Sequence, residues 1–144
     1  MPQDQNGFNP SELKRITIFV GAYGSGKSEV SVNFAFWLAK KDKPVILCDL
    51  DIINPFYRPA DARRAIEDAG IRLVAPLYAG SNVEAPAVPA DVFSVFDESG
   101  CRAVLDIGGE DLGARVIASL KNRFWNRSEE RRVGQECRYG WSPD

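Results

Sequence analysis

The residue types that could do chemistry in this chain are concentrated in one glycine-rich segment. Residues 21–28 read GAYGSGKS and fit the pattern GxxxxGK[ST] at every fixed position. Glycines let successive backbone N–H groups point inward at phosphate oxygens, and the start of a following helix adds its positive dipole. Lys27 supplies a positive charge for β- and γ-phosphates, and Ser28 supplies a hydroxyl for Mg²⁺. The segment therefore predicts a phosphate-binding loop. The alternative is a strand-to-helix turn that binds no ligand.

The residues expected to contact a nucleotide lie in this loop, directly after it, and at one later glycine. They are Gly21, Tyr23, Gly24, Ser25, Gly26, Lys27, Ser28, Glu29 and Gly109. Tyr23 can cover the phosphates, face a partner, or simply stand exposed. Gly108 and Gly109 follow an apolar run, where backbone N–H groups can reach a γ-phosphate and lose that contact with the diphosphate.

Three aspartates follow two other apolar runs. Asp49 and Asp51 come after residues 45–48, and Asp106 comes after residues 103–105. Because ligands of open α/β sheets bind at the carboxyl ends of strands, each should point at the phosphate site if its strand neighbours the first one. Asp106 is then the natural holder of Mg²⁺, and Asp49 and Asp51 face the metal or an attacking water. The alternative for any one of them is a helix cap or a turn former.

The elements that must position these residues alternate along the chain. Short apolar runs predict strands over 16–20, 45–48, 71–74 and 103–107, and helical patterns predict helices over 27–41, 58–69, 90–98 and from about Gly113. This alternation predicts an α/β fold, a doubly wound and mostly parallel sheet with helices on both faces. Val30, Phe34, Trp37 and Leu38 fall at helical spacing and are predicted to form the buried face of their helix.

Composition limits the other classes of function. The 144 residues carry a net charge of −2, so no basic field indicates a nucleic-acid partner. There is no histidine, and the three cysteines form no metal-binding pair. No apolar run approaches the ~20 residues of a membrane span, which predicts a cytoplasmic protein.

Three regions are expected along the chain: a flexible lead-in over 1–13, a phosphate-loop domain over 14–126, and a tail over 127–144. The tail reads RSEERRVGQECRYGWSPD and has no apolar period. It closely resembles a common sequencing adapter translated in frame. We interpret it as an assembly scar that truncates the natural gene near Asn126, and a genuine charged tail is the alternative.

Three segments together resemble the nucleotide motifs of the CobQ/CobB/MinD/ParA nucleotide-binding superfamily: residues 21–28, CDLD at 48–51 and LDIGG at 105–109. The resemblance covers about 16–120, and DLDIINPFYR at 49–58 is similar to a poorly characterised bacterial branch of ATP-binding proteins. It implies ATP with Mg²⁺: Lys27 would bind phosphates, Ser28 would ligate the metal with support from Asp49 and Asp106, and Asp51 would position the hydrolytic water.

Many members of this superfamily carry a second lysine early in the loop, which reaches across an ATP-bound dimer. That position here is Ala22, which places a lysine-bridged homodimer in doubt. Arg58, Arg63 or Arg64 could supply the charge instead, although a solvated helix face is the simpler interpretation.

Three functions fit these observations. The first is a slow, Mg²⁺-dependent ATPase that acts as a switch read by a protein partner. The second is an ATP-dependent small-molecule kinase or ligase whose acceptor site is lined by residues 54–58 and 76–89. The third is a module that holds nucleotide without catalysis. Fold analogy favours the first.

Overall fold

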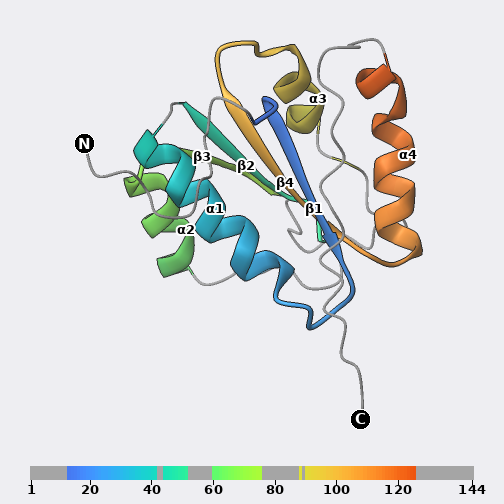
Figure 1. The fold of residues 1–144 in the computed structure, drawn as a ribbon, viewed down its shortest axis with the longest axis horizontal. Helices are drawn as coiled ribbons and strands as arrows, with labels where there is room; N and C mark the ends of the chain where they lie inside the picture. Colours follow the sequence, from blue (N-terminus) through green and yellow to red (C-terminus); the bar gives the residue numbers. More distant parts are fainter. Residues whose placement is uncertain (1–12, 42–43, 52–59, 76–87, 89, 126–144) are drawn as a thin grey trace.

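The computed structural model describes residues 13–41, 44–51, 60–75, 88 and 90–125, which form alternating strands and helices (Figure 1). In chain order the elements are β1 (Ile16–Gly21), α1 (Lys27–Lys41), β2 (Val45–Asp49), α2 (Ala60–Asp68), β3 (Ile71–Val74), α3 (Ala90–Asp97), β4 (Arg102–Gly108) and α4 (Asp111–Trp125). All four strands are parallel and lie in the order β1-β4-β2-β3. The predicted α/β class with a parallel sheet is confirmed.

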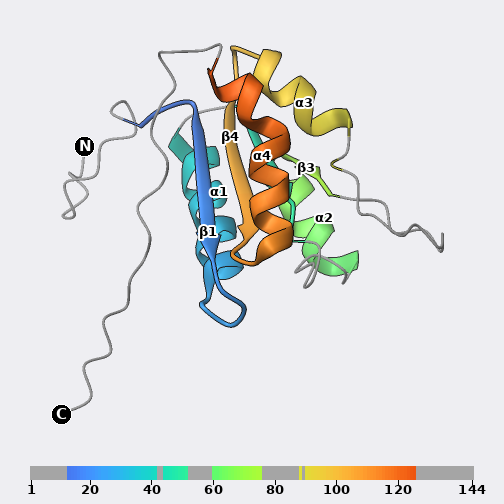
Figure 2. The same ribbon diagram turned by 90° about the vertical axis from the view of Figure 1, so that its right-hand side faces the viewer.

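The sheet has one apolar core on each face. One core joins buried residues of α1 and α2 to Val45, Leu47 and Val104 of the sheet. The other joins α3 and α4 to Ile46, Leu105 and their neighbours. Alternate residues of β2 and β4 enter opposite cores because successive side chains of a strand point to opposite faces. Helices therefore cover both faces, and β1 and β4 lie between α1 and α4 (Figure 2).

Helix α1 corrects one sequence-based prediction. Its buried residues are Ser31, Ala35 and Leu38, whereas Val30 is 49% exposed. Phe34 and Trp37 are half-buried and pack at the side of this core, so only Leu38 of the predicted face is fully buried. Small side chains at the contact let the helix axis approach the sheet closely, which shifts the buried face by one residue. Periodicity alone cannot distinguish these two neighbouring faces.

Helix α4 begins at Asp111, two residues before the predicted start near Gly113. Gly113 lies inside the first turn because α4 starts directly against the end of β4. A Cβ atom at Gly113 would stand 1.6 Å from the carbonyl oxygen of Gly108. The glycine that suggested a helix boundary is therefore a packing requirement within the helix.

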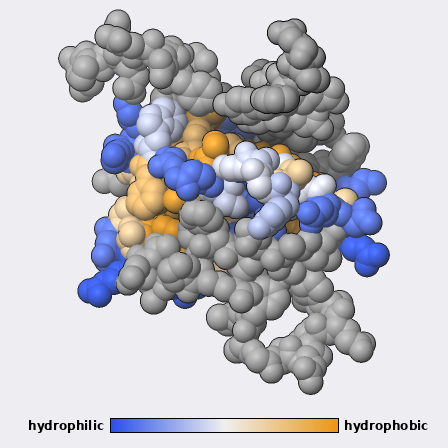
Figure 3. Space-filling model, turned by 90° about the horizontal axis from the view of Figure 1, so that it is seen from below, coloured by the Kyte–Doolittle hydropathy of each residue, from blue (hydrophilic) through white to orange (hydrophobic). Residues whose placement is uncertain are grey.

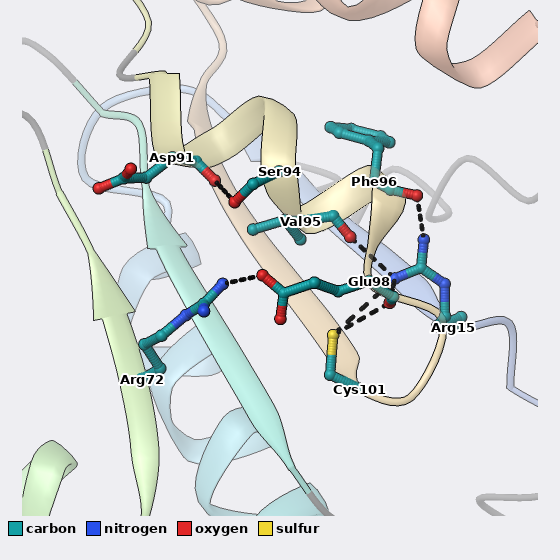
Figure 4. Close-up of polar contacts among 8 residues, drawn as sticks. All are labelled: Arg15, Arg72, Asp91, Ser94, Val95, Phe96, Glu98 and Cys101. Carbon is teal, nitrogen blue, oxygen red and sulfur yellow. Dashed lines mark hydrogen bonds and ion pairs between the residues drawn. The ribbon is translucent and has the colours of Figure 1, made fainter.

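At the amino end of the sheet, Arg15 ties the residues before β1 to the end of α3 (Figure 4). Its guanidinium donates hydrogen bonds to the carbonyl oxygens of Val95, Phe96 and Glu98 at 3.0, 3.1 and 2.8 Å. These carbonyls lack helical partners, and a cation at a helix C-terminus is favoured by the helix dipole. The contact ties the end of α3 to the residue that precedes β1.

No helix within the described ranges has the length and apolar character that crossing a membrane requires.

Candidate functional site

The loop between β1 and α1 forms a polar hollow at the carboxyl end of the sheet. Gly24 and Gly26 adopt positive φ angles of 74° and 76°, and the loop is closed by a 3.1 Å hydrogen bond from the Ser25 amide to the Ala22 carbonyl. A Cβ atom added at either glycine would meet no atom within 4 Å, so the backbone faces open space there. The hollow has a volume of about 260 Å³ and is lined by Ala22, Tyr23, Gly24, Ser25, Gly26, Lys27, Ser28, Glu29 and Asp51.

The strand order brings the predicted acidic residues to this hollow. β4 pairs with β1, and Asp106 lies opposite Phe19, two residues before the loop begins. β2 does not neighbour β1. It pairs with β4, so Asp49 lies opposite Asp106, and the Leu50 amide donates to the Asp106 carbonyl at 2.8 Å. The acidic segment after β2 is thereby held beside the phosphate loop through β4.

Lys27 is the point at which the loop and the acids meet. Its Nζ lies 2.5 Å from Asp106 Oδ1, 2.9 Å from Asp51 Oδ2 and 3.2 Å from Ser28 Oγ. The side chains are largely withdrawn from solvent, with exposures of 6% for Lys27, 12% for Asp51 and 0% for Asp106. Removing one partner of a buried charge pair is costly, because the other charge is then left buried and uncompensated.

The electrostatics of the cluster follow from burial and from these charges. Burial lowers the pKa of Lys27, but the hydrogen bonds and charges of Asp106 and Asp51 outweigh it and raise that pKa above its ordinary value. Burial, together with the charge of Asp106, raises the pKa of Asp49 from 3.8 to about 7. The Asp51 amide opposes this shift by donating to Asp49 Oδ1 at 3.2 Å. Asp49 thus holds the Asp51 backbone by a hydrogen bond, and its carboxyl group titrates near neutral pH.

Two buried oxygens of the acidic residues, Asp49 Oδ2 and Asp106 Oδ2, have no hydrogen-bond partner. Unpartnered buried carboxylate oxygens are rare unless a ligand or ion satisfies them. Mg²⁺ prefers oxygen ligands and typically uses one or two protein groups together with phosphate oxygens and water. Ser28 and a buried aspartate fit that requirement. Among the described residues, no three acidic or cysteine side chains form a metal cage of their own.

The glycine pair at the end of β4 is arranged differently from the simplest expectation. The Gly109 amide, predicted to reach a γ-phosphate, donates to the Gly21 carbonyl at 2.9 Å. A contact with phosphate therefore requires this hydrogen bond to break. Gly108, the other glycine of the pair, borders Asp51: a Cβ atom there would lie 3.4 Å from Asp51 Oδ1. The two glycines keep the space beside Asp51 and the loop free of side chains.

The remaining predicted contact residues lie at the rim. Tyr23 is 72% exposed at the tip of the loop, and Glu29 is exposed in the first turn of α1. The Asn33 amide holds Glu29 by donating to its carbonyl and carboxylate oxygens at 2.8 and 3.3 Å. Seen from below, this side of the molecule shows pale atoms of intermediate hydropathy between blue and orange ones (Figure 3).

Several predictions lie outside the described residues: most of the lead-in over 1–13, the block at 54–58 with Arg58, most of the loop over 76–89, and the tail over 127–144. Arg63 and Arg64 are exposed on α2, as expected for a solvated face.

The chain matches no known protein family, no curated protein and no solved structure. The resemblance of its motifs to the CobQ/CobB/MinD/ParA superfamily therefore remains a prediction.

Proposed function

We propose that this protein binds ATP together with Mg²⁺ in the cytoplasm and hydrolyses it slowly, as a nucleotide switch. The observation that carries the proposal is the meeting of Lys27 with Asp51 and Asp106 beside a glycine loop whose backbone faces open space. A cation, a hydroxyl and buried carboxylates around one hollow are what a triphosphate and a divalent ion require.

Each group has a role that its position supports. The backbone of residues 22–27 and the start of α1 bind the phosphates, with Lys27 as the full charge. Ser28 and Asp106 would hold Mg²⁺, which supplies charge neutralisation at the phosphates. Asp49 accepts a hydrogen bond from the Asp51 amide and so helps to hold Asp51 in place. Asp51 lines the hollow and orients a water.

A switch also needs a segment whose conformation depends on the presence of the γ-phosphate. The hydrogen bond between Gly109 and Gly21 joins the segment after β4 to the first residue of the loop. A γ-phosphate that draws the Gly109 amide away would break this bond and move the start of α4. A protein partner or a second copy of the chain would read that movement.

The test is turnover of ATP with excess Mg²⁺, followed by release of inorganic phosphate. We expect slow hydrolysis by the parent chain. Asp51→Ala should keep its affinity for nucleotide and lose turnover, because the water is no longer oriented. Glu67→Ala, which removes an exposed carboxylate on α2, is the matched control and should hydrolyse at the parent rate.

Equal turnover by Asp51→Ala and the parent chain would remove Asp51 from the mechanism. Tight binding without any turnover would favour a non-catalytic nucleotide module. Release of ADP that depends strictly on an added acceptor would favour a kinase or ligase.

A further inference from the structure

Lys27 contacts two carboxylates, and the proposed function also assigns it the phosphates of a nucleotide. Its amino group cannot bind both sets of partners at once. Its amino group already contacts Asp106 at 2.5 Å and Asp51 at 2.9 Å, and all three side chains are at most 12% exposed. Among the described residues that line the hollow, this amino group is the only full positive charge. Any phosphate bound there competes with two carboxylates for it.

We propose that Asp51 and Asp106 act as a carboxylate latch on Lys27, which makes nucleotide and divalent cation bind as a coupled pair. This inference rests on the proposed function and adds a regulatory contact to it. If Lys27 turns to a phosphate, two carboxylates are left withdrawn from water, next to the negative phosphates. That arrangement is unfavourable unless another cation takes the place of Lys27.

The second observation is the unpartnered Asp106 Oδ2, on the same carboxylate whose Oδ1 contacts Lys27. Asp106 thus already lacks one partner, and losing Lys27 would leave both of its oxygens without one. A divalent cation can satisfy this carboxylate and restore the charge balance. Nucleotide without metal should consequently bind weakly. A divalent cation should strengthen nucleotide binding because it neutralises the two carboxylates.

Asp51 is the residue on which to test the latch, because it lies after β2, beyond the buried strand. Asp51→Asn keeps the shape of the side chain and removes its charge. In excess EDTA, we expect this variant to bind ATP about tenfold more tightly than the parent chain, since a charged hydrogen bond to Lys27 no longer opposes the phosphates. In excess Mg²⁺ the difference should shrink to within about threefold, because the cation offsets the acids in the parent.

The measurement is isothermal titration of the whole chain with ATP under both conditions. Glu67→Gln is the matched control: it removes one exposed carboxylate on α2 and should bind like the parent in EDTA and in Mg²⁺. Asp51→Ser is the second variant, with the same expected direction if Asp51→Asn does not fold. Thermal melting of each variant establishes that it is folded.

The parent chain supplies an independent reading, because its affinity for ATP should fall at least about tenfold when Mg²⁺ is removed. The latch is overturned if the parent binds ATP in Mg²⁺ but neither Asp51 variant gains affinity in EDTA. It is also overturned if Mg²⁺ changes the affinity of the parent by less than about twofold. Either result leaves nucleotide binding intact. Absence of ATP binding by the parent in both conditions would instead overturn the proposed function, and the latch with it.

Discussion

The two ends of the parallel sheet gather polar groups in opposite ways. At the amino end, the Arg15 guanidinium donates to three carbonyl oxygens that close α3. At the carboxyl end, Lys27 serves two carboxylates, while Asp49 Oδ2 and Asp106 Oδ2 have no partner. Buried polar groups that have hydrogen-bond partners stabilise the fold, whereas buried polar groups without one point to a missing partner such as a ligand, an ion or a water. The difference separates the structural end of the molecule from its candidate binding end.

The largest expected effect is at Lys27. Lys27→Met should lower ATP affinity about 100-fold, because the main charge for the phosphates is lost. It should also lower the free energy of unfolding by about 3 kcal/mol, since Asp51 and Asp106 lose their shared partner. Titration calorimetry and urea unfolding measure the two effects, and Lys40→Met at the exposed end of α1 is the control. Unchanged affinity in Lys27→Met would contradict the assignment of the carboxyl end.

The next effect concerns the proton on Asp49. Its pKa is raised from 3.8 to about 7, so the folded chain binds this proton more tightly than the unfolded chain. The stability that this proton contributes is complete below about pH 4 and is lost as the pH rises through about 7. In metal-free buffer the parent should lose on the order of 2 kcal/mol over this range relative to Asp49→Asn. Urea unfolding at several pH values measures this, with Asp68→Asn on α2 as control, and parallel pH profiles for the parent and Asp49→Asn would contradict it.

A comparable effect without loss of binding is expected at the amino end. Arg15→Ala should lower the free energy of unfolding by about 2 kcal/mol, because three carbonyl oxygens lose a charged donor. Its affinity for ATP should equal that of the parent. Arg63→Ala, on the exposed face of α2, controls for the loss of a positive charge. A large change in ATP affinity in Arg15→Ala would show that the two ends are not independent.

The smallest effect sharpens the same comparison from the surface. Arg72 and Glu98 form a 2.6 Å ion pair near Arg15, but their side chains are 50% and 40% exposed. Glu98→Gln should change the free energy of unfolding by no more than about 0.5 kcal/mol, because exposed pairs are weakened by water and salt. The backbone carbonyl that Arg15 uses remains in place. A loss as large as that of Arg15→Ala would mean that the side chains, not the helix end, dominate this region.

Much of this arrangement is readable in the sequence because it depends on local patterns. The apolar run before GAYGSGKS predicts β1, the loop and the start of α1, and the structure places these elements over nearly the expected residues. The strand order is not local. Asp106 lies beside the loop because β4 pairs with β1, and no residue pattern states that pairing.

The parts that the sequence missed depend on close packing or on distant partners. Arg15 looks like an ordinary charge just before the first strand, and its partners lie about 80 residues later in the chain. Val30 fits the helical period but is exposed, because Ser31 and Ala35 form the closer contact with the sheet. Gly113 looks like a helix boundary, and only the nearby Gly108 carbonyl shows why no side chain fits.

The most direct test of the difference between the two ends is a two-dimensional ¹H–¹⁵N spectrum of the chain, titrated with ATP in excess Mg²⁺. The account predicts saturable shifts of the amides in residues 21–29, at Asp51 and at 106–109, with the amides of Arg15, residues 95–98 and Cys101 nearly unmoved. Shifts centred on the amino end, or no saturable shifts at all, would contradict it.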